Sequence, residues 1–128
     1  MGVSATFRFR TENVTRTFDL LESASTARRW KCKRIDDVAT VSEGSQMKMR
    51  IRGGLDLADK DLPKTAVVTG MVDGDGEAGV ITIEARPSAG VDNVGGRLGI
   101  QSKWENALTA WTGELARAMN MGAPPASR

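Results

Sequence analysis

Basic side chains recur at alternate positions in three strand-like runs, and these residues are the ones whose spacing most suggests chemistry. The runs carry Arg8 and Arg10, then Arg29, Lys31 and Lys33, then Lys48, Arg50 and Arg52. Because alternate residues of a strand share one face, each run would place its cations on one side of a sheet. If the runs are neighbours, this face would bind nucleic acid or an acidic partner in a salt-sensitive way.

The charge distribution agrees with such a surface but does not require it. Residues 1–52 contain eleven Lys and Arg against six Asp and Glu, whereas residues 53–128 contain seven against ten. No aromatic residue shares the alternate positions of the cations in the three basic runs, since Phe7, Phe9 and Trp30 occupy the intervening positions, and this disfavours a reader of single-stranded RNA. A basic face that is merely solvated remains the alternative to an anion-binding module.

Catalytic and metal-binding residue types are scarce. The chain has no histidine, no tyrosine and one cysteine, Cys32. Strand alternation points Cys32 inward with Trp30, and no histidine is present to activate it as a nucleophile. We therefore predict no catalytic residue, no metal site and no cofactor, and we expect a binding or structural domain.

The glycine-rich stretch 74–79 matches two ligand-binding patterns superficially. It reads G-x-G-x-x-G, but strands rather than a helix are predicted after it, which argues against a dinucleotide site. Asp73, Asp75, Glu77 and Glu84 also imitate a calcium loop, although Ala78 occupies the position where the sharp turn needs glycine. We interpret the stretch as a hairpin turn.

Large apolar side chains form a second candidate site. Tryptophan and methionine side chains could line an apolar ligand cavity between a C-terminal helix and the sheet. With Leu108 of the same helical stripe, this candidate set consists of Trp30, Met47, Met49, Trp104, Leu108 and Trp111. The alternative is that these residues simply fill the core, as apolar residues at this spacing usually do.

The first half of the chain predicts a strand, a helix and a hairpin. Period-two alternation predicts a strand over 3–10, and Asn13 is a suitable N-cap for a helix over about 14–24. Alternation resumes over 28–35 and continues through Val38 and Val41. Glu43-Gly44 then predicts the turn of a hairpin whose second arm contains Met47, Met49 and Ile51.

The second half predicts another hairpin and a long helix. Acidic residues and Pro63 predict an exposed loop over 55–64, and strands over 65–72 and 79–86 flank a turn at 73–78. After a glycine-containing connection at 87–99, a helix over about 102–120 is predicted. Ser102 would cap it, and its apolar stripe is Trp104, Leu108, Trp111, Leu115, Ala118 and Met119.

These elements predict an α+β fold, an antiparallel sheet with a short N-terminal and a long C-terminal helix packed on one face. We expect one domain over 1–122 and a disordered tail over 123–128. The lone cysteine and the absence of a long apolar run favour a cytoplasmic protein without a membrane span. The sequence does not predict the oligomeric state.

Three stretches of the sequence together carry a resemblance to a known family. The first is an early helical segment, Thr17-Phe18-Asp19-Leu20-Leu21-Glu22 with Ala27-Arg28-Arg29-Trp30. The second covers the central hairpins with Ile51-Arg52-Gly53-Gly54-Leu55-Asp56-Leu57, Leu62-Pro63 and Gly76-Glu77-Ala78-Gly79, and the third is Gly95-Gly96-Arg97-Leu98 before the terminal helix. They resemble the START-like (polyketide-cyclase, SRPBCC) superfamily with its helix-grip fold, and slightly its branch associated with carbon monoxide dehydrogenase.

The resemblance implies a domain that binds an apolar small molecule or a protein partner beneath its terminal helix. Trp104, Leu108 and Trp111 would form part of the cavity wall, and no catalytic residue carries over. The chain departs from the superfamily by offering one helix after its first strand where two are usual. It also offers the 87–99 segment where a further strand would precede the last helix.

Overall fold

The computed structural model describes residues 4–44, 62–74, 76–88 and 100–119. Within these ranges the chain forms, in order, β1 (Ala5–Thr11), α1 (Val14–Arg28), β2 (Lys31–Ile35), β3 (Val38–Glu43), β4 (Lys64–Val72), β5 (Gly79–Pro87) and α3 (Ile100–Met119). The order of strand, helix, strands and helix is the one expected from the sequence, but the strand that precedes β4 among the described residues is β3 and not the predicted run at Met47 to Arg52. The tail expected over 123–128 and the connection over 89–99 lie outside the described residues.

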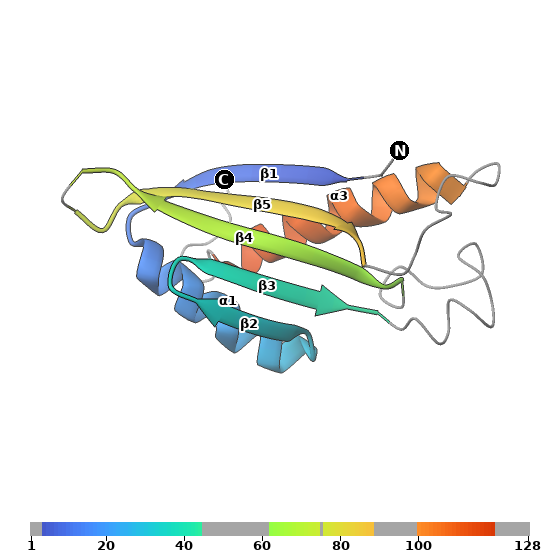
Figure 1. Ribbon diagram of the computed structural model, residues 1–128, viewed down its shortest axis with the longest axis horizontal. Helices are drawn as coiled ribbons and strands as arrows, with labels where there is room; N and C mark the ends of the chain where they lie inside the picture. The colour runs from blue at the N-terminus through green and yellow to red at the C-terminus, as the bar shows by residue number, and fades with distance from the viewer. Residues whose placement is uncertain (1–3, 45–61, 75, 89–99, 120–128) are drawn as a thin grey trace.

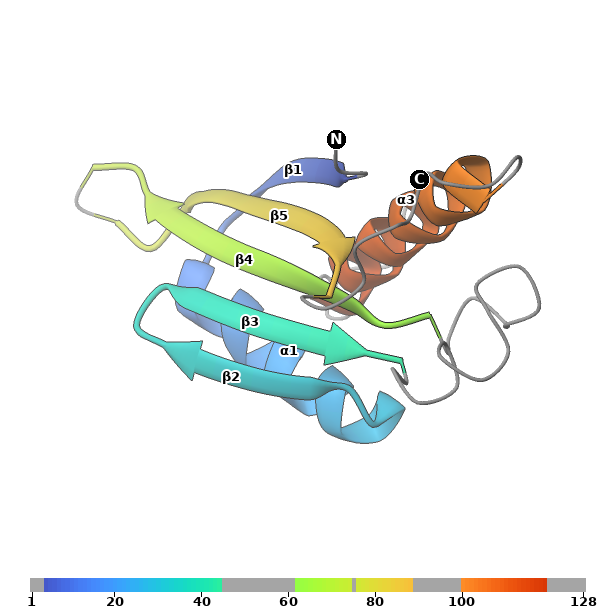
Figure 2. The same cartoon turned by 45° about the vertical axis from the view of Figure 1, so that its right-hand side comes forward.

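The described strands form one antiparallel sheet in the order β1-β5-β4-β3-β2. Both helices lie on the same face of this sheet (Figures 1 and 2). Helix α3 packs on β1 and β5, α1 packs on β2, β4 and β5, and the two helices touch each other. The predicted α+β fold with both helices on one sheet face is confirmed.

Helix α1 has the start that we expected and a later end. The Asn13 side chain accepts a hydrogen bond of 2.9 Å from the Arg16 backbone N–H, as an N-cap does. The helix continues to Arg28, beyond the predicted 24, and Arg29 ends it in the left-handed conformation with φ of 62°. The backbone N–H of Arg29 is directed at the carbonyls of Ser25 and Thr26, so Arg29 closes a helix and does not begin a strand.

The first hairpin turns at a different place from the one predicted. Asp36 and Asp37 connect β2 to β3, with Asp36 at a φ of 54°. Both edges of β3 are paired, with β2 and β4, so Glu43-Gly44 is not the turn of a hairpin. The expected strand at Met47 to Arg52 lies outside the described residues.

The second hairpin is confirmed, and its turn also holds the start of α1. The backbone N–H of Val14 donates to the carbonyl of Glu77 over 2.8 Å, and the Asn13 amide donates to the Glu77 carboxylate over 2.8 Å. A carboxylate at a helix N-terminus is electrostatically favourable. The 73–78 turn therefore fixes where α1 leaves β1.

Helix α3 begins two residues earlier than the predicted cap. It starts at Ile100, so Ser102 belongs to the first turn and the expected capping box with Glu105 is wrong. The predicted stripe is confirmed, since Trp104, Leu108, Trp111 and Leu115 are all buried. Among the described residues, neither helix is long and apolar enough to cross a membrane.

The core lies between the helices and the sheet. The sheet contributes Ala39, Val41, Ala66, Val68, Ile81, Ile83 and Ala85, and α1 contributes Val14, Phe18 and Leu21. Leu62 and Lys64 are also buried, so the exposed loop predicted over 55–64 does not extend to its last residues. The remainder of that segment, 55–61, lies outside the described residues.

Candidate functional site

The tryptophans predicted to line a ligand cavity are buried between the helices and the sheet. Trp104 and Leu108 are fully buried, Trp111 is 2% exposed and Trp30 is 5% exposed. The Trp30 and Trp111 rings meet edge to face with centroids 6.1 Å apart, a favourable aromatic geometry. Met47 and Met49, the other two predicted members, lie outside the described residues.

A buried ion pair lies at the edge of this aromatic cluster. Glu43 on β3 is directly opposite Lys64 on β4, and the Lys64 Nζ lies 2.7 Å from the Glu43 Oε1. Val41 and Ala66 face the helices as part of the core. Glu43 is two residues after Val41 and Lys64 is two residues before Ala66, so strand alternation directs both side chains toward the helices as well. The Lys64 side chain is 2% exposed, which makes this a charged pair at the end of the apolar core.

Both partners of the pair also contact tryptophan. The Trp30 Nε1–H donates to the Glu43 Oε2 over 2.6 Å, so each oxygen of this carboxylate has a partner. The Lys64 Nζ lies 5.2 Å from the centroid of the Trp111 ring, within the range of a cation–π contact. Because a buried charge is costly unless it is paired, these contacts hold Lys64, Glu43 and both rings in one arrangement.

A second, more exposed ion pair lies nearby and joins the two helices. The Arg28 Nε at the end of α1 is 3.2 Å from the Glu114 Oε2 on α3, and the two side chains are 37% and 42% exposed. The Arg28 guanidinium lies 5.4 Å from the centroid of the Trp30 ring. An exposed pair of this kind contributes little to stability, so its position matters more than its energy.

These residues surround an open cleft of about 420 Å³ beside α3. Its lining consists of Arg28, Glu43, Lys64, Ala107, Ala110, Trp111 and Glu114. These lining residues belong to the end of α1, the end of β3, the start of β4 and the middle of α3, and Figure 2 shows how these elements are arranged. This volume is within the range of small-molecule sites.

The lining of the cleft combines paired charges with an apolar wall. Its described residues include no hydroxyl, thiol or imidazole group, and each of its carboxylates is paired with a cation. Trp111, Ala107 and Ala110 offer an apolar wall next to the charges. The cleft can therefore hold the apolar part of a ligand on α3 while Arg28 meets an anionic group.

The predicted cationic residues on the described strands lie at the two edges of the sheet. Arg8 and Arg10 on β1 and Lys31 and Lys33 on β2 are exposed on the same face, but β1 and β2 are the opposite edges of the sheet. These two runs are therefore not neighbours, because alternation defines a face and does not define which strands pair. Arg29 lies at the end of α1, and Lys48, Arg50 and Arg52 lie outside the described residues.

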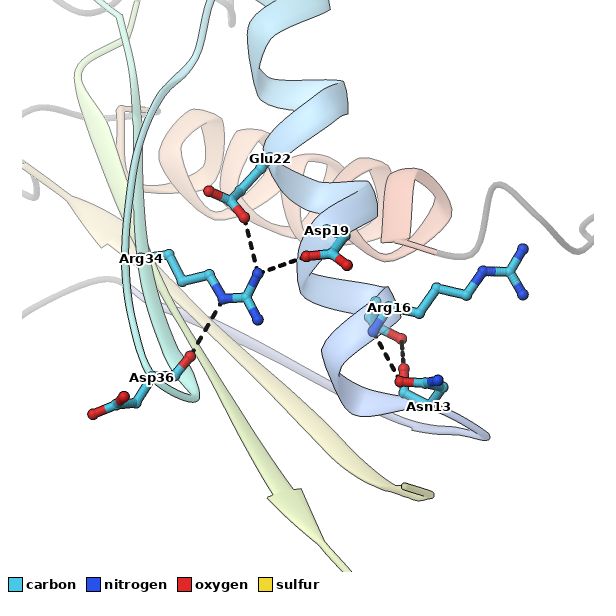
Figure 3. A network of polar contacts seen from close by, with 7 residues as sticks. Asn13, Arg16, Asp19, Glu22, Arg34 and Asp36 are labelled. Atoms are coloured by element: carbon cyan, nitrogen blue, oxygen red, sulfur yellow. Dashed lines mark hydrogen bonds and ion pairs between the residues drawn. The ribbon is translucent and has the colours of Figure 1, made fainter. Parts of the chain in front are cut away.

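A polar network ties α1 to the edge strand β2 (Figure 3). One terminal nitrogen of Arg34 lies 2.8 Å from the Asp19 carboxylate and 2.9 Å from the Glu22 carboxylate. Its hydrogen bonds to Asp19 and Glu22 raise the pKa of the Arg34 guanidinium. The network is on the helix side of the sheet, away from the cleft lining, and we assign it a structural role.

Cys32 faces the helices, as strand alternation predicted. It lies opposite Val41 and packs against the core cluster. Burial raises the pKa of its thiol, so the cysteine is less ionised than a free one. We therefore interpret Cys32 as a packing residue.

The described carboxylates of the calcium-loop pattern are paired with other side chains. Asp73 pairs with Arg10 over 2.7 Å, Glu77 accepts from Asn13, and Glu84 pairs with Arg86 over 2.8 Å on β5. Across the part of the chain that the structure describes, no three His, Cys, Asp or Glu side chains are grouped so that they could hold a metal ion. Asp75 lies outside the described residues.

We predict that millimolar calcium leaves the melting temperature unchanged. Binding an ion at Asp73 and Glu77 would break the contact with Arg10 and the one with the start of α1. A ligand that binds only the folded state raises the melting temperature, so thermal melts with calcium and with chelator decide the question. A rise with calcium, but not with magnesium, would show that the loop rearranges into a site.

The charged residues of the cleft were not predicted from the sequence. Glu43 was expected in a turn and Lys64 in an exposed loop, and Glu114 was not singled out. A signal was present for Glu43, since Ala39, Val41 and Glu43 are in phase on one strand face. For Lys64, the alternation of Lys64, Ala66 and Val68 carries the same information.

No family model matches this chain, and a search of curated proteins gives no match either.

Proposed function

We propose that this chain is a non-enzymatic START-like binding domain that holds a small amphipathic molecule in the cleft beside α3. The observation that supports this proposal most is the cleft itself, where the apolar wall of Trp111, Ala107 and Ala110 adjoins the Arg28–Glu114 pair. The order of elements and the packing of a long terminal helix on the sheet agree with the START-like resemblance. The single helix between β1 and β2 departs from it.

The charges of the cleft favour a ligand with a carboxylate at one end. Lys64 and Glu43 neutralise each other at the buried side, so they do not select a charged ligand. Arg28 is more exposed, and Glu114 contacts only its Nε among the described residues. A guanidinium has five N–H donors, so the terminal nitrogens of Arg28 can donate to a ligand carboxylate while the alkyl part lies on Trp111.

Titration with dodecanoate tests this proposal. We expect dodecanoate to change the tryptophan emission and to raise the melting temperature, because a ligand at a hundred times its Kd stabilises the folded state by about 2.7 kcal/mol. Replacing Ala110, an exposed cleft residue, by Trp should abolish the melting-temperature shift by filling the cleft. Since this variant adds an indole, the shift in melting temperature is its readout, measured with a dye.

Arg28→Gln supplies the matched test of head-group recognition. It should weaken dodecanoate binding while leaving dodecanol binding unchanged, since the alcohol has no carboxylate to lose. Lys33→Gln on the opposite sheet face should alter neither ligand. The proposal is wrong if dodecanoate does not bind, or if it binds equally well to Ala110→Trp.

A further inference from the structure

The face of the sheet opposite the helices carries a surface that the cleft proposal does not use. Within the described part of the chain, no helix or strand covers this face (Figures 1 and 2). Strand pairing places on it the alternate residues of every strand, including Arg8, Val67 and Lys33. We call it the open face.

Exposed apolar side chains lie on the inner strands β3 and β4 of the open face, next to Ile35 on β2. Ile35 lies directly opposite Val38, and Val38 lies opposite Thr69, which Val67 and Met71 flank on β4. These four apolar side chains are 62%, 42%, 37% and 70% exposed in the order Ile35, Val38, Val67 and Met71. They surround the exposed Thr69 near the β2–β3 turn, and exposed apolar side chains that are grouped into a patch in this way mark an interaction site.

Cations border this patch at both edges of the sheet. Arg8 and Arg10 lie along β1, and Lys31 and Lys33 lie along β2, all of them exposed. Arg10 is paired with Asp73, and Arg86 on the same face is paired with Glu84, so Arg8, Lys31 and Lys33 are the cations of this face that have no carboxylate partner among the described residues. Since strands are about 4.8 Å apart, four spacings separate the two cationic edges by roughly 19 Å.

We infer that the open face docks an acidic amphipathic helix of a protein partner. A helix with its side chains is about 10–12 Å wide, so it fits between the edges with an apolar stripe on Val38 and Val67. Glutamates or aspartates on both flanks of that stripe would meet Arg8 on one side and Lys33 on the other. An apolar centre inside a charged rim is the usual anatomy of such an interface.

The same residues disfavour the other occupants. A second copy of the chain would bring its own cationic edges against these edges, and like charges across an interface are costly. A phosphate backbone gains nothing from covering the patch of Ile35, Val38, Val67 and Met71. A lipid surface favours Trp, Phe or Leu for insertion, whereas the apolar side chains of the described open face are Val, Ile and Met.

Binding of synthetic peptides to the intact chain tests the inference. The probe is a labelled helical peptide with a leucine stripe flanked on both sides by glutamates. Its matched controls have lysines in place of the glutamates, or serines in place of the leucines. We expect the acidic amphipathic peptide to bind more tightly than both controls, with an affinity that falls as salt screens the charges. Backbone amide shifts should map to β2, β3 and β4.

Charge reversal locates the contact and separates it from the cleft. Arg8→Glu combined with Lys33→Glu should weaken peptide binding by at least about tenfold, since two attractions become repulsions. Both positions are exposed, so the fold should survive, and circular dichroism checks this. Ala110→Trp in the cleft should leave peptide binding unchanged. Equal binding of the lysine peptide, no effect of the double variant, or tighter binding of duplex DNA or phosphatidylserine vesicles would each overturn the inference.

Discussion

Trp111→Ala should destabilise the protein by about 3–5 kcal/mol, the usual cost of truncating a large buried aromatic residue. Trp111 is 2% exposed, meets Trp30 edge to face, and lies under the buried Lys64 ammonium. Its loss would open a cavity at the point where α3, α1 and the ion pair meet. A domain of this size has a total stability of about 5–15 kcal/mol, so urea melts should show a barely folded variant.

Two variants serve as controls for this result. Lys33→Gln lies on the open face and should change the free energy of unfolding by less than about 0.5 kcal/mol. Trp111→Phe keeps much of the aromatic volume and removes an indole N–H that has no acceptor among the described residues, so it should cost less than Trp111→Ala. If Trp111→Ala is as mild as Lys33→Gln, the aromatic cluster does not support the core.

Local sequence patterns were sufficient to predict the elements whose buried apolar residues recur at one regular spacing. The spacing of Trp104, Leu108 and Trp111 predicted the inward face of α3, because a helix returns to the same side every three to four residues. The hairpin of β4 and β5 followed from Val and Ile alternation around a glycine-rich turn. In both cases the residues that create the pattern are adjacent on one element.

The first hairpin shows where a strong local signal misled. Gly44 does adopt a positive φ of 108°, as a turn residue would, and a Cβ there would lie within 2.1 Å of the Leu62 carbonyl oxygen. The positive φ of Gly44 therefore belongs to a close contact between Gly44, which follows β3, and Leu62, which precedes β4. The actual turn uses Asp36 in the left-handed region, which aspartate tolerates better than most residues.

Strand order could not be predicted from alternation. The pattern of Arg8 and Arg10 on one run and of Lys31 and Lys33 on another correctly indicated one sheet face. Pairing β1 with β5 depends on contacts between residues far apart in sequence, which no local pattern encodes. The cations consequently lie along the two edges of the open face and do not cover it. They therefore suit a different ligand from the one expected of a continuous basic surface.

The ion pair of Lys64 and Glu43 could not be predicted from the sequence, for a related reason. Lysine and glutamate are rarely buried unless paired, so each was assigned to the surface when considered alone. Only the register that places Glu43 opposite Lys64 lets Lys64 be buried, with the Glu43 side chain 20% exposed beside it. Of the residues predicted to contact a ligand, Trp111 is in the cleft lining, whereas Trp30, Trp104 and Leu108 belong to the core, and the charged lining residues were not predicted.

Lys64→Met should cost about 3–5 kcal/mol, because removing one partner of a buried pair leaves an uncompensated charge. The methionine fills a similar volume, so the loss would measure charge and not a cavity. Glu43 would keep its hydrogen bond from Trp30, but its other oxygen would face an apolar side chain at the edge of the core. Denaturant melts of Lys64→Met measure this loss as a change in the free energy of unfolding.

The double variant Lys64→Met with Glu43→Gln should recover most of that loss. Glutamine still offers an oxygen to the Trp30 Nε1–H. Neither position of the pair then carries a charge, and replacing a buried ion pair by neutral residues is often close to neutral in stability. The interaction energy from the four-variant cycle should exceed about 1 kcal/mol. If the two losses simply add, Lys64 and Glu43 do not depend on each other, and the charged side of the cleft is held by other contacts.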